Sequence, residues 1–89
     1  MDKRVTKSIY LGPYDFLTER LIAARKAAKM TQMEVAAKLE KPQSFVSKYE
    51  HSERRLDVVE FLVVCQVLKA DAVDIIEQTK AEITEDHRL

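Results

Sequence analysis

The side chains that could perform catalysis are few in this chain, and they do not gather in the sequence. His51 and His87 lie far apart, and neither belongs to a metal-ligand spacing such as His-x-x-x-His. Ser44, Ser47 and His51 share one neighbourhood, but their positions are those of helix contacts and loop surface rather than of a hydrolytic triad. With one glycine in 89 residues, the chain has no glycine-rich phosphate loop. The sequence therefore predicts a protein that is not an enzyme and that uses no metal and no cofactor.

The only cysteine, Cys65, lies inside the apolar run 61–68. A single thiol cannot form an internal disulfide, which fits a reducing compartment, and we expect it to pack inertly in the core. The chain has no apolar run near the roughly 20 residues that span a bilayer, and its N-terminus lacks the pattern of a signal peptide. We expect a cytoplasmic protein that does not associate with a membrane.

The formal net charge of zero conceals an uneven distribution. Residues 1–55 carry 12 Lys and Arg against 7 Asp and Glu, whereas residues 56–89 carry 3 against 8. A basic half favours a surface that meets an anion. An ordinary mixed surface would have the same composition, so charge alone leaves both interpretations open.

Helix-forming residues dominate the composition, which predicts one all-α domain. An N-terminal arm is expected over residues 1–14, as a short strand or a flexible tail, and a polar tail over residues 84–89. Between them, over residues 15–83, apolar spacing and capping residues predict five short helices. Thr31-Gln-Met-Glu34 is a capping box, in which each side chain can bond the other residue's backbone N–H. The residues expected to open the helices are Asp15, Thr31, Pro42 (as the first helical residue), Asp57 and Asp71. The corresponding helix ends are expected near residues 29, 39, 50, 68 and 83.

Two of these helices are separated by a three- or four-residue turn, over about residues 32–50. The small residue Ala36 stands where the two helices must approach closely. This is the sequence form of a helix-turn-helix. Any compact helical bundle contains adjacent short helices, so spacing alone leaves DNA binding open.

The residue identities are more specific, because residues 21–71 resemble the lambda-repressor-like regulators of the Xre or Cro type. The resemblance implies a five-helix domain that binds double-stranded DNA as a homodimer and regulates transcription, as a repressor, with its third helix in the major groove. The segments that carry it are Arg25, Met30–Gln32, Val35–Leu39, Gln43–Glu50, Glu53–Leu56 and Val64–Leu68.

The resemblance assigns base contacts to the third helix, at the positions of Gln43, Ser44, Ser47 and Lys48. Their types suit that role, because glutamine can pair bidentately with adenine, serine can donate or accept, and lysine can reach guanine or a phosphate. Phe45 lies between them, where its ring could touch a thymine methyl or could lie over the helix-turn-helix surface.

Phosphate contacts are implied at the start of the second helix and in two loops. The family's glutamine at the first of these positions binds a phosphate and corresponds to Gln32. Lys41, Arg54 and Arg55 lie in loops where phosphates commonly run. Each of these three could equally be a solvated surface charge.

The family also pairs an arginine of the first helix with the glutamate that closes the recognition helix. The matching residues are Arg25 and Glu50, and we interpret this pair as structural rather than as a DNA contact. The chain departs from the family at Glu40 and Ser52, where glycine is usual. A left-handed backbone at either position would cost about 1 kcal/mol, or the turn takes another shape.

The expected fourth helix carries two apolar stripes, one of which needs cover. The family commonly has a polar residue at the position of Val63. The N-terminal arm, a second subunit or the chain's own core could cover the second stripe. The first stripe is Val58, Phe61, Leu62, Cys65 and Leu68, and the second is Val59, Val63 and Val67.

A protein-interaction module is the alternative function. The same fold serves as an antitoxin that binds a toxin and represses its own operon. The apolar stripe and the acidic C-terminal half favour a protein partner, whereas the polar face of the third helix favours DNA.

Overall fold

The computed structural model describes residues 12–87, which form five helices. These residues contain no strand, so the predicted all-α fold is confirmed for them. Most of the expected N-terminal arm lies outside the described residues, as do the last two residues of the expected polar tail. The helices are α2 (Pro13–Ala27), α3 (Gln32–Leu39), α4 (Gln43–Glu50), α5 (Val58–Leu68) and α6 (Ala72–Lys80).

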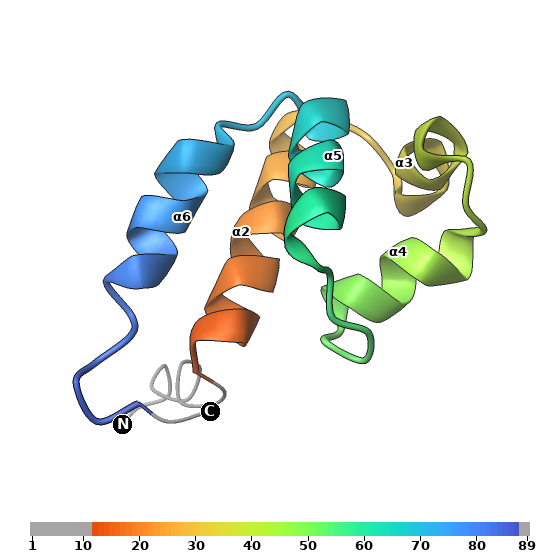
Figure 1. The fold of residues 1–89 in the computed structure, drawn as a ribbon. Coiled ribbons are helices and arrows are strands. Elements are labelled where there is room, and N and C mark those ends of the chain that lie inside the picture. Colours follow the sequence, from red (N-terminus) through yellow and green to blue (C-terminus); the bar gives the residue numbers. More distant parts are fainter. Residues whose placement is uncertain (1–11, 88–89) are drawn as a thin grey trace, which may run out of the picture.

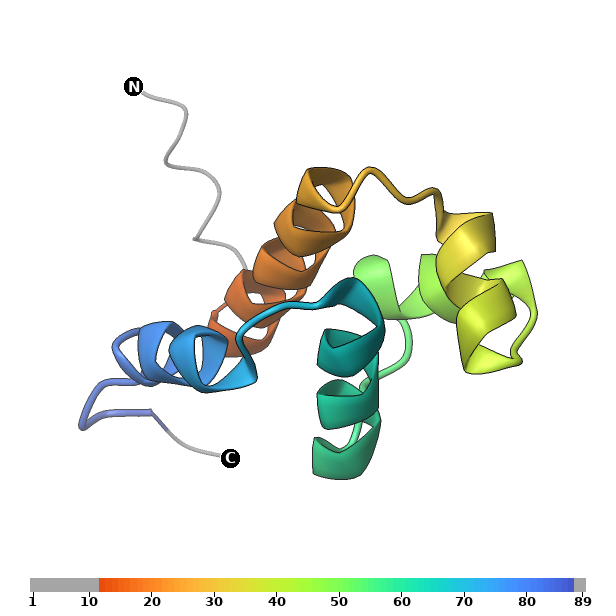
Figure 2. The ribbon, with the colours of Figure 1, turned by 90° about the horizontal axis from the view of Figure 1, so that it is seen from above.

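The helices α2 and α5 form the middle of the molecule, with α6 on one side and the α3–α4 pair on the other (Figures 1 and 2). All five helices contribute side chains to a single core. Because α3 and α4 both pack on this core, the turn between them is held rigidly at one end of the domain. The most deeply buried side chains are Leu21, Val35, Val46, Tyr49, Val64 and Cys65.

Three helix starts follow the predicted caps. The hydroxyl of Thr31 accepts from the backbone N–H of Glu34 at 3.0 Å, and the Glu34 carboxylate accepts from the Thr31 N–H at 2.8 Å. Asp57 and Glu60 form the same reciprocal pair at the start of α5. The carboxylate of Asp71 caps α6 alone. These caps satisfy backbone donors that a helix start leaves without partners.

Three expected boundaries are wrong. Helix α2 begins at Pro13, and its N-cap is Gly12 rather than Asp15, because proline has the preset φ of a first helical residue. Pro42 is the N-cap of α4, with an extended backbone (φ −71°, ψ 157°), rather than its first residue. Helix α6 ends at Lys80, and Ile83 beyond it is 50% exposed rather than packed on the core.

Glu40 and Ser52 both adopt the left-handed conformation that glycine favours, with φ of 58° and 60°. At Glu40 the turn is closed by a backbone hydrogen bond from Lys41 N to Ala36 O at 3.0 Å, as in a Schellman motif. Both left-handed positions are therefore formed without glycine, at a cost of about 1 kcal/mol per residue.

The buried face of helix α5 coincides with neither of the two predicted stripes. Val58 and Leu62, two members of the first stripe, are 72% and 46% exposed, so the first stripe is not the buried face of the helix. Val64 is 1% exposed and packs there instead. The contacting residues Phe61, Val64, Cys65 and Leu68 recur at intervals of three and four, as one face of a helix requires.

The second predicted stripe divides between surface and core. Val59 and Val63 are 67% and 43% exposed, whereas Val67 is partly buried against the core.

Within residues 12–87, no helix combines the length and hydropathy needed to cross a membrane.

Candidate nucleic-acid interface

Helix α4 has one buried face and one polar face. Val46, Tyr49 and Glu50 point inward, with Val46 and Tyr49 at most 1% exposed. The four predicted base-contacting residues occupy positions one, two, five and six of the helix, so they share its other side. Of these four, three are exposed and Ser47 is half-buried. We call this set the α4 polar strip: Gln43, Ser44, Ser47 and Lys48.

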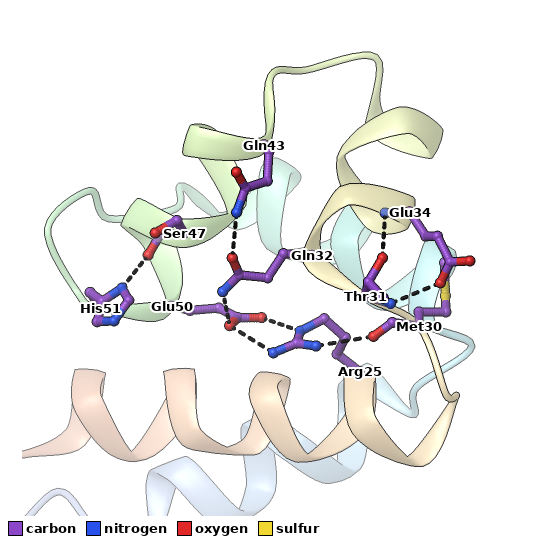
Figure 3. Close-up of polar contacts among 9 residues, drawn as sticks. All are labelled: Arg25, Met30, Thr31, Gln32, Glu34, Gln43, Ser47, Glu50 and His51. Carbon is purple, nitrogen blue, oxygen red and sulfur yellow. Dashed lines mark hydrogen bonds and ion pairs between the residues drawn. The ribbon is translucent and has the colours of Figure 1, made fainter.

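Gln32 lies beside the α4 polar strip and is hydrogen-bonded to it. The amide Nε2 of Gln43 donates to Oε1 of Gln32 at 2.8 Å. In turn, Nε2 of Gln32 donates to Oε1 of Glu50 at 2.8 Å (Figure 3). The structure therefore brings together one predicted base contact, one predicted phosphate contact and the glutamate of the predicted ion pair.

Arg25 and Glu50 form a bidentate ion pair between α2 and α4. The guanidinium Nε donates to Oε2 of Glu50 at 2.6 Å, and Nη2 donates to Oε1 at 3.1 Å. Nη1 donates to the carbonyl of Met30 at 3.0 Å, which ties the turn before α3 to the same group. The two side chains are only 13% and 4% exposed, and the bond to Glu50 raises the pKa of Arg25 above its usual value. The polar chain from Gln43 through Gln32 and Glu50 to Arg25 thus anchors the α4 polar strip in the bundle.

The ring of Phe45 is held between two cations and the core. The Nζ of Lys41 lies 5.5 Å from the ring centroid, and the guanidinium carbon of Arg54 lies 4.6 Å from it. Tyr49 meets the same ring edge-on, with the two centroids 5.8 Å apart. These contacts favour packing over the helix-turn-helix surface rather than a contact with a thymine methyl.

Arg54 forms an ion pair with Glu60 in addition to its contact with the ring of Phe45. Its Nη1 and Nη2 donate to the two carboxylate oxygens of Glu60 at 3.0 and 2.9 Å. Hydrogen bonds from Arg54 and from the backbone of Asp57 lower the pKa of Glu60 to about 2. The sequence did not indicate Glu60 as a partner of Arg54, because the two residues belong to different elements, the loop after α4 and helix α5. Arg55 is exposed, and its guanidinium carbon lies 4.6 Å from the ring centroid of Tyr14.

The loop after α4 is fixed to the first turn of α2. The hydroxyl of Ser52 donates to the carboxylate of Asp15, and the hydroxyl of Thr18 donates to the Asp15 carbonyl at 2.9 Å. The backbone N–H of Leu56 donates to the Tyr14 hydroxyl at 2.9 Å. These bonds hold the loop that carries Arg54 and Arg55, and they support the left-handed backbone of Ser52.

Ser44 and Ser47, which were considered with His51 for catalysis, belong to the α4 polar strip. The imidazole Nδ1 of His51 lies 2.7 Å from the carbonyl of Ser47, at the end of α4. Cys65 is 2% exposed, and burial together with the charge of Asp71 raises the pKa of its thiol to about 11. Among residues 12–87, no three or more His, Cys, Asp or Glu side chains are arranged to hold a metal.

Comparison with known proteins agrees with this geometry. A protein-family model described as Helix-turn-helix matches residues 21–75. Among solved structures, the chain is similar to an XRE-family like protein from Pseudomonas syringae pv. tomato str. DC3000, with 43% sequence identity and a TM-score of 0.76. That similarity covers 92% of this chain and 100% of the other. A search among curated proteins found no match.

Proposed function

The chain belongs to the helix-turn-helix family, in its Xre or lambda-repressor-like group, and is a DNA-binding transcriptional regulator. We propose that it recognises one duplex sequence as a homodimer and represses transcription there. The observation that carries the proposal is the α4 polar strip, which faces outward from a helix whose other side is locked into the core. An α-helix of this kind fits the major groove, where polar side chains can read base edges.

The α4 polar strip supplies the sequence reading. Gln43 can offer a donor and an acceptor to adenine, Ser44 and Ser47 can donate or accept, and Lys48 can donate to guanine. Three of these four side chains are exposed, so they can reach base edges without unfolding any part of the helix.

Phosphate binding falls to residues that flank the α4 polar strip. Gln32 spends one amide hydrogen on Glu50, which leaves the other for a phosphate oxygen. Lys41 and Arg55 are exposed cations on either side of α4 in the chain. Arg54 shares its charge with Glu60, so we expect it to contribute less to phosphate binding than Lys41 or Arg55.

Selection of bound fragments from genomic DNA tests this function. Wild-type protein should recover a short palindromic motif that survives moderate salt, with half-sites about 34 Å apart. Lys48→Ala should weaken or relax that selection and leave the fold intact. Lys80→Ala is the matched control, because Lys80 is 67% exposed on α6, on the far side of the molecule from α4. Binding that is free of any motif and lost with salt would contradict the proposal.

An exposed apolar face on α5 supports the homodimer. Val58, Val59, Leu62 and Val63 are between 43% and 72% exposed and recur at helical positions one, two, five and six. None of the four is charged, so two copies related by a twofold axis could bury the same face against each other. We therefore assign the cover of this face to a second subunit, with Val59 and Val63 in its centre and Val67 at its buried edge.

A charge placed in this face tests the dimer. Val63→Glu should convert the wild-type dimer to a monomer in light scattering, because an unpaired carboxylate would be buried at the interface. Val73→Glu, which alters a 69% exposed valine on α6, should leave the dimer unchanged. Equal masses for wild type and Val63→Glu would contradict this interface. A monomeric wild type would instead favour the second candidate function, in which a different protein such as a toxin covers the face.

A further inference from the structure

The guanidinium of Arg54 is largely occupied inside the protein. Its Nη1 and Nη2 donate to the two carboxylate oxygens of Glu60, and Nη1 also donates to the backbone carbonyl of Arg55 at 3.0 Å. Because a guanidinium carries five hydrogens, these bonds use three of them. Arginine binds a phosphate through a pair of parallel N–H groups, and Glu60 fills the pair formed by Nη1 and Nη2.

Glu60 is also held by its own helix. Its carboxylate accepts from the backbone N–H of Asp57 at 2.9 Å, in the capping box that opens α5. Hydrogen bonds from Arg54 and Asp57 lower the pKa of Glu60 to about 2, and the charge of Lys41 acts in the same direction. A carboxylate that is charged at neutral pH therefore acts on two of the cations that flank the α4 polar strip.

We propose that Glu60 is an internal competitor for DNA phosphate, which keeps Arg54 from binding the backbone of unrelated sequences. A carboxylate and a phosphate bind the same pair of N–H groups, so a phosphate gains this pair only by displacing Glu60. The Arg54–Glu60 pair has no net charge, so it adds little to the sequence-independent attraction for DNA. Base reading by the α4 polar strip then accounts for a larger share of the affinity. The inference rests on the proposed function, in which α4 reads the major groove.

The exposure of this pair makes the competition possible. The side chains of Arg54 and Glu60 are 40% and 31% exposed, so a phosphate could reach the guanidinium once the carboxylate charge is removed. The Arg25–Glu50 pair is far more buried, at 13% and 4%, and has a structural role instead. The ring of Phe45 on α4 lies 4.6 Å from the guanidinium carbon of Arg54. This contact would keep the cation beside α4 in the absence of Glu60.

Glu60→Gln tests the competition on a duplex of scrambled sequence, which measures phosphate binding alone. Glutamine can keep the capping box with Asp57, so α5 should stay intact, and helical circular dichroism equal to that of the wild type checks this. The variant should bind the scrambled duplex at least about threefold more tightly than the wild type at about 50 mM salt. One further phosphate contact is worth about a threefold change in affinity between about 50 and 200 mM salt, so this gain should largely disappear at the higher concentration.

Glu53→Gln is the matched control. It removes the same charge from the loop that carries Arg54, where Glu53 is exposed and is not a hydrogen-bond partner of Arg54. It should raise the affinity less than Glu60→Gln does and leave the salt dependence unchanged. The double variant Arg54→Gln/Glu60→Gln removes both charges of the pair and should bind the scrambled duplex as the wild type does. Because it has the net charge of the wild type, it decides the matter if Glu60→Gln alone does not fold.

The outcomes separate the inference from the proposed function. Equal gains in Glu60→Gln and Glu53→Gln overturn the inference, because charge at a distance would then explain both. Weaker binding by Glu60→Gln, or by the double variant, also overturns it, because Arg54 would then already bind phosphate in the wild type. A wild type that selects no motif contradicts the proposed function alone, because the scrambled duplex tests the inference without any sequence preference.

Discussion

Removal of the Arg25 guanidinium should destabilise the domain more than removal of any exposed cation. In the wild type the Glu50 side chain is 4% exposed, and in Arg25→Ala its carboxylate keeps only its bond to Gln32. Loss of one partner from a buried pair costs about 3–5 kcal/mol, because the remaining charge is left uncompensated. An 89-residue domain has a total stability of roughly 4–13 kcal/mol, so this loss is a large fraction of it.

Urea and thermal unfolding, followed by circular dichroism, measure this loss. Each kcal/mol lowers the Tm of a domain of this size by about 4–8 °C, so the expected fall is about 12 °C or more. Lys26→Ala is the matched control: it removes the neighbouring exposed cation of α2 and should change stability by no more than about 0.5 kcal/mol.

The double variant Arg25→Ala/Glu50→Ala refines the test. Because it leaves no unpaired carboxylate, its loss should be smaller than the sum of the two single losses. A loss below about 1 kcal/mol in Arg25→Ala, typical of an exposed pair, would refute the argument that Arg25 and Glu50 anchor the recognition helix.

Three further changes test other parts of the structure. Lys69→Gly should raise the free energy of unfolding by about 0.5–1 kcal/mol, because Lys69 ends α5 at φ 57°, whereas Lys38→Gly inside α3 should lower it; urea titration of both variants checks the sign. Cys65, whose pKa is raised to about 11, should react with iodoacetamide at pH 8 at least about 100-fold more slowly in the native protein than in urea, and similar rates would contradict its burial. Glu60→Gln should lower stability at neutral pH, and because the pKa of Glu60 is lowered to about 2, its difference from wild type should shrink as the pH falls from about 5 toward 2; a difference independent of pH would argue against the pair with Arg54.

Features encoded by neighbouring residues could be predicted from the sequence. The capping box at Thr31 and the helix start at Asp57 depend only on residues within one turn, and both form as expected. Asp15 does not cap α2 as expected, because its carboxylate accepts from Ser52 instead. That contact could not be predicted, because Ser52 lies 37 residues away in the chain. The buried face of α5 could not be predicted, because nearly every residue from Val58 to Leu68 is apolar and no polar face marks the solvent side.

In the candidate site too, the sequence predicted which residues take part but not the contacts between residues far apart in the chain. The resemblance identified which residues belong to the surface, including Gln32 and Gln43 as separate contacts. It did not indicate that one amide holds the other, because the bond depends on how α3 and α4 meet in space. The ion pair of Arg54 with Glu60 could not be predicted for a related reason, because it depends on how the loop after α4 lies against α5.

The most direct test of the account is a comparison of binding to the selected duplex and to a scrambled duplex of equal length, at low and at moderate salt. Phosphate attraction acts on both duplexes and weakens with salt, whereas base reading by the α4 polar strip acts on one duplex alone. The account predicts that the selected duplex stays bound at moderate salt after the scrambled one is lost. Equal affinities for the two duplexes at both salt concentrations would contradict it.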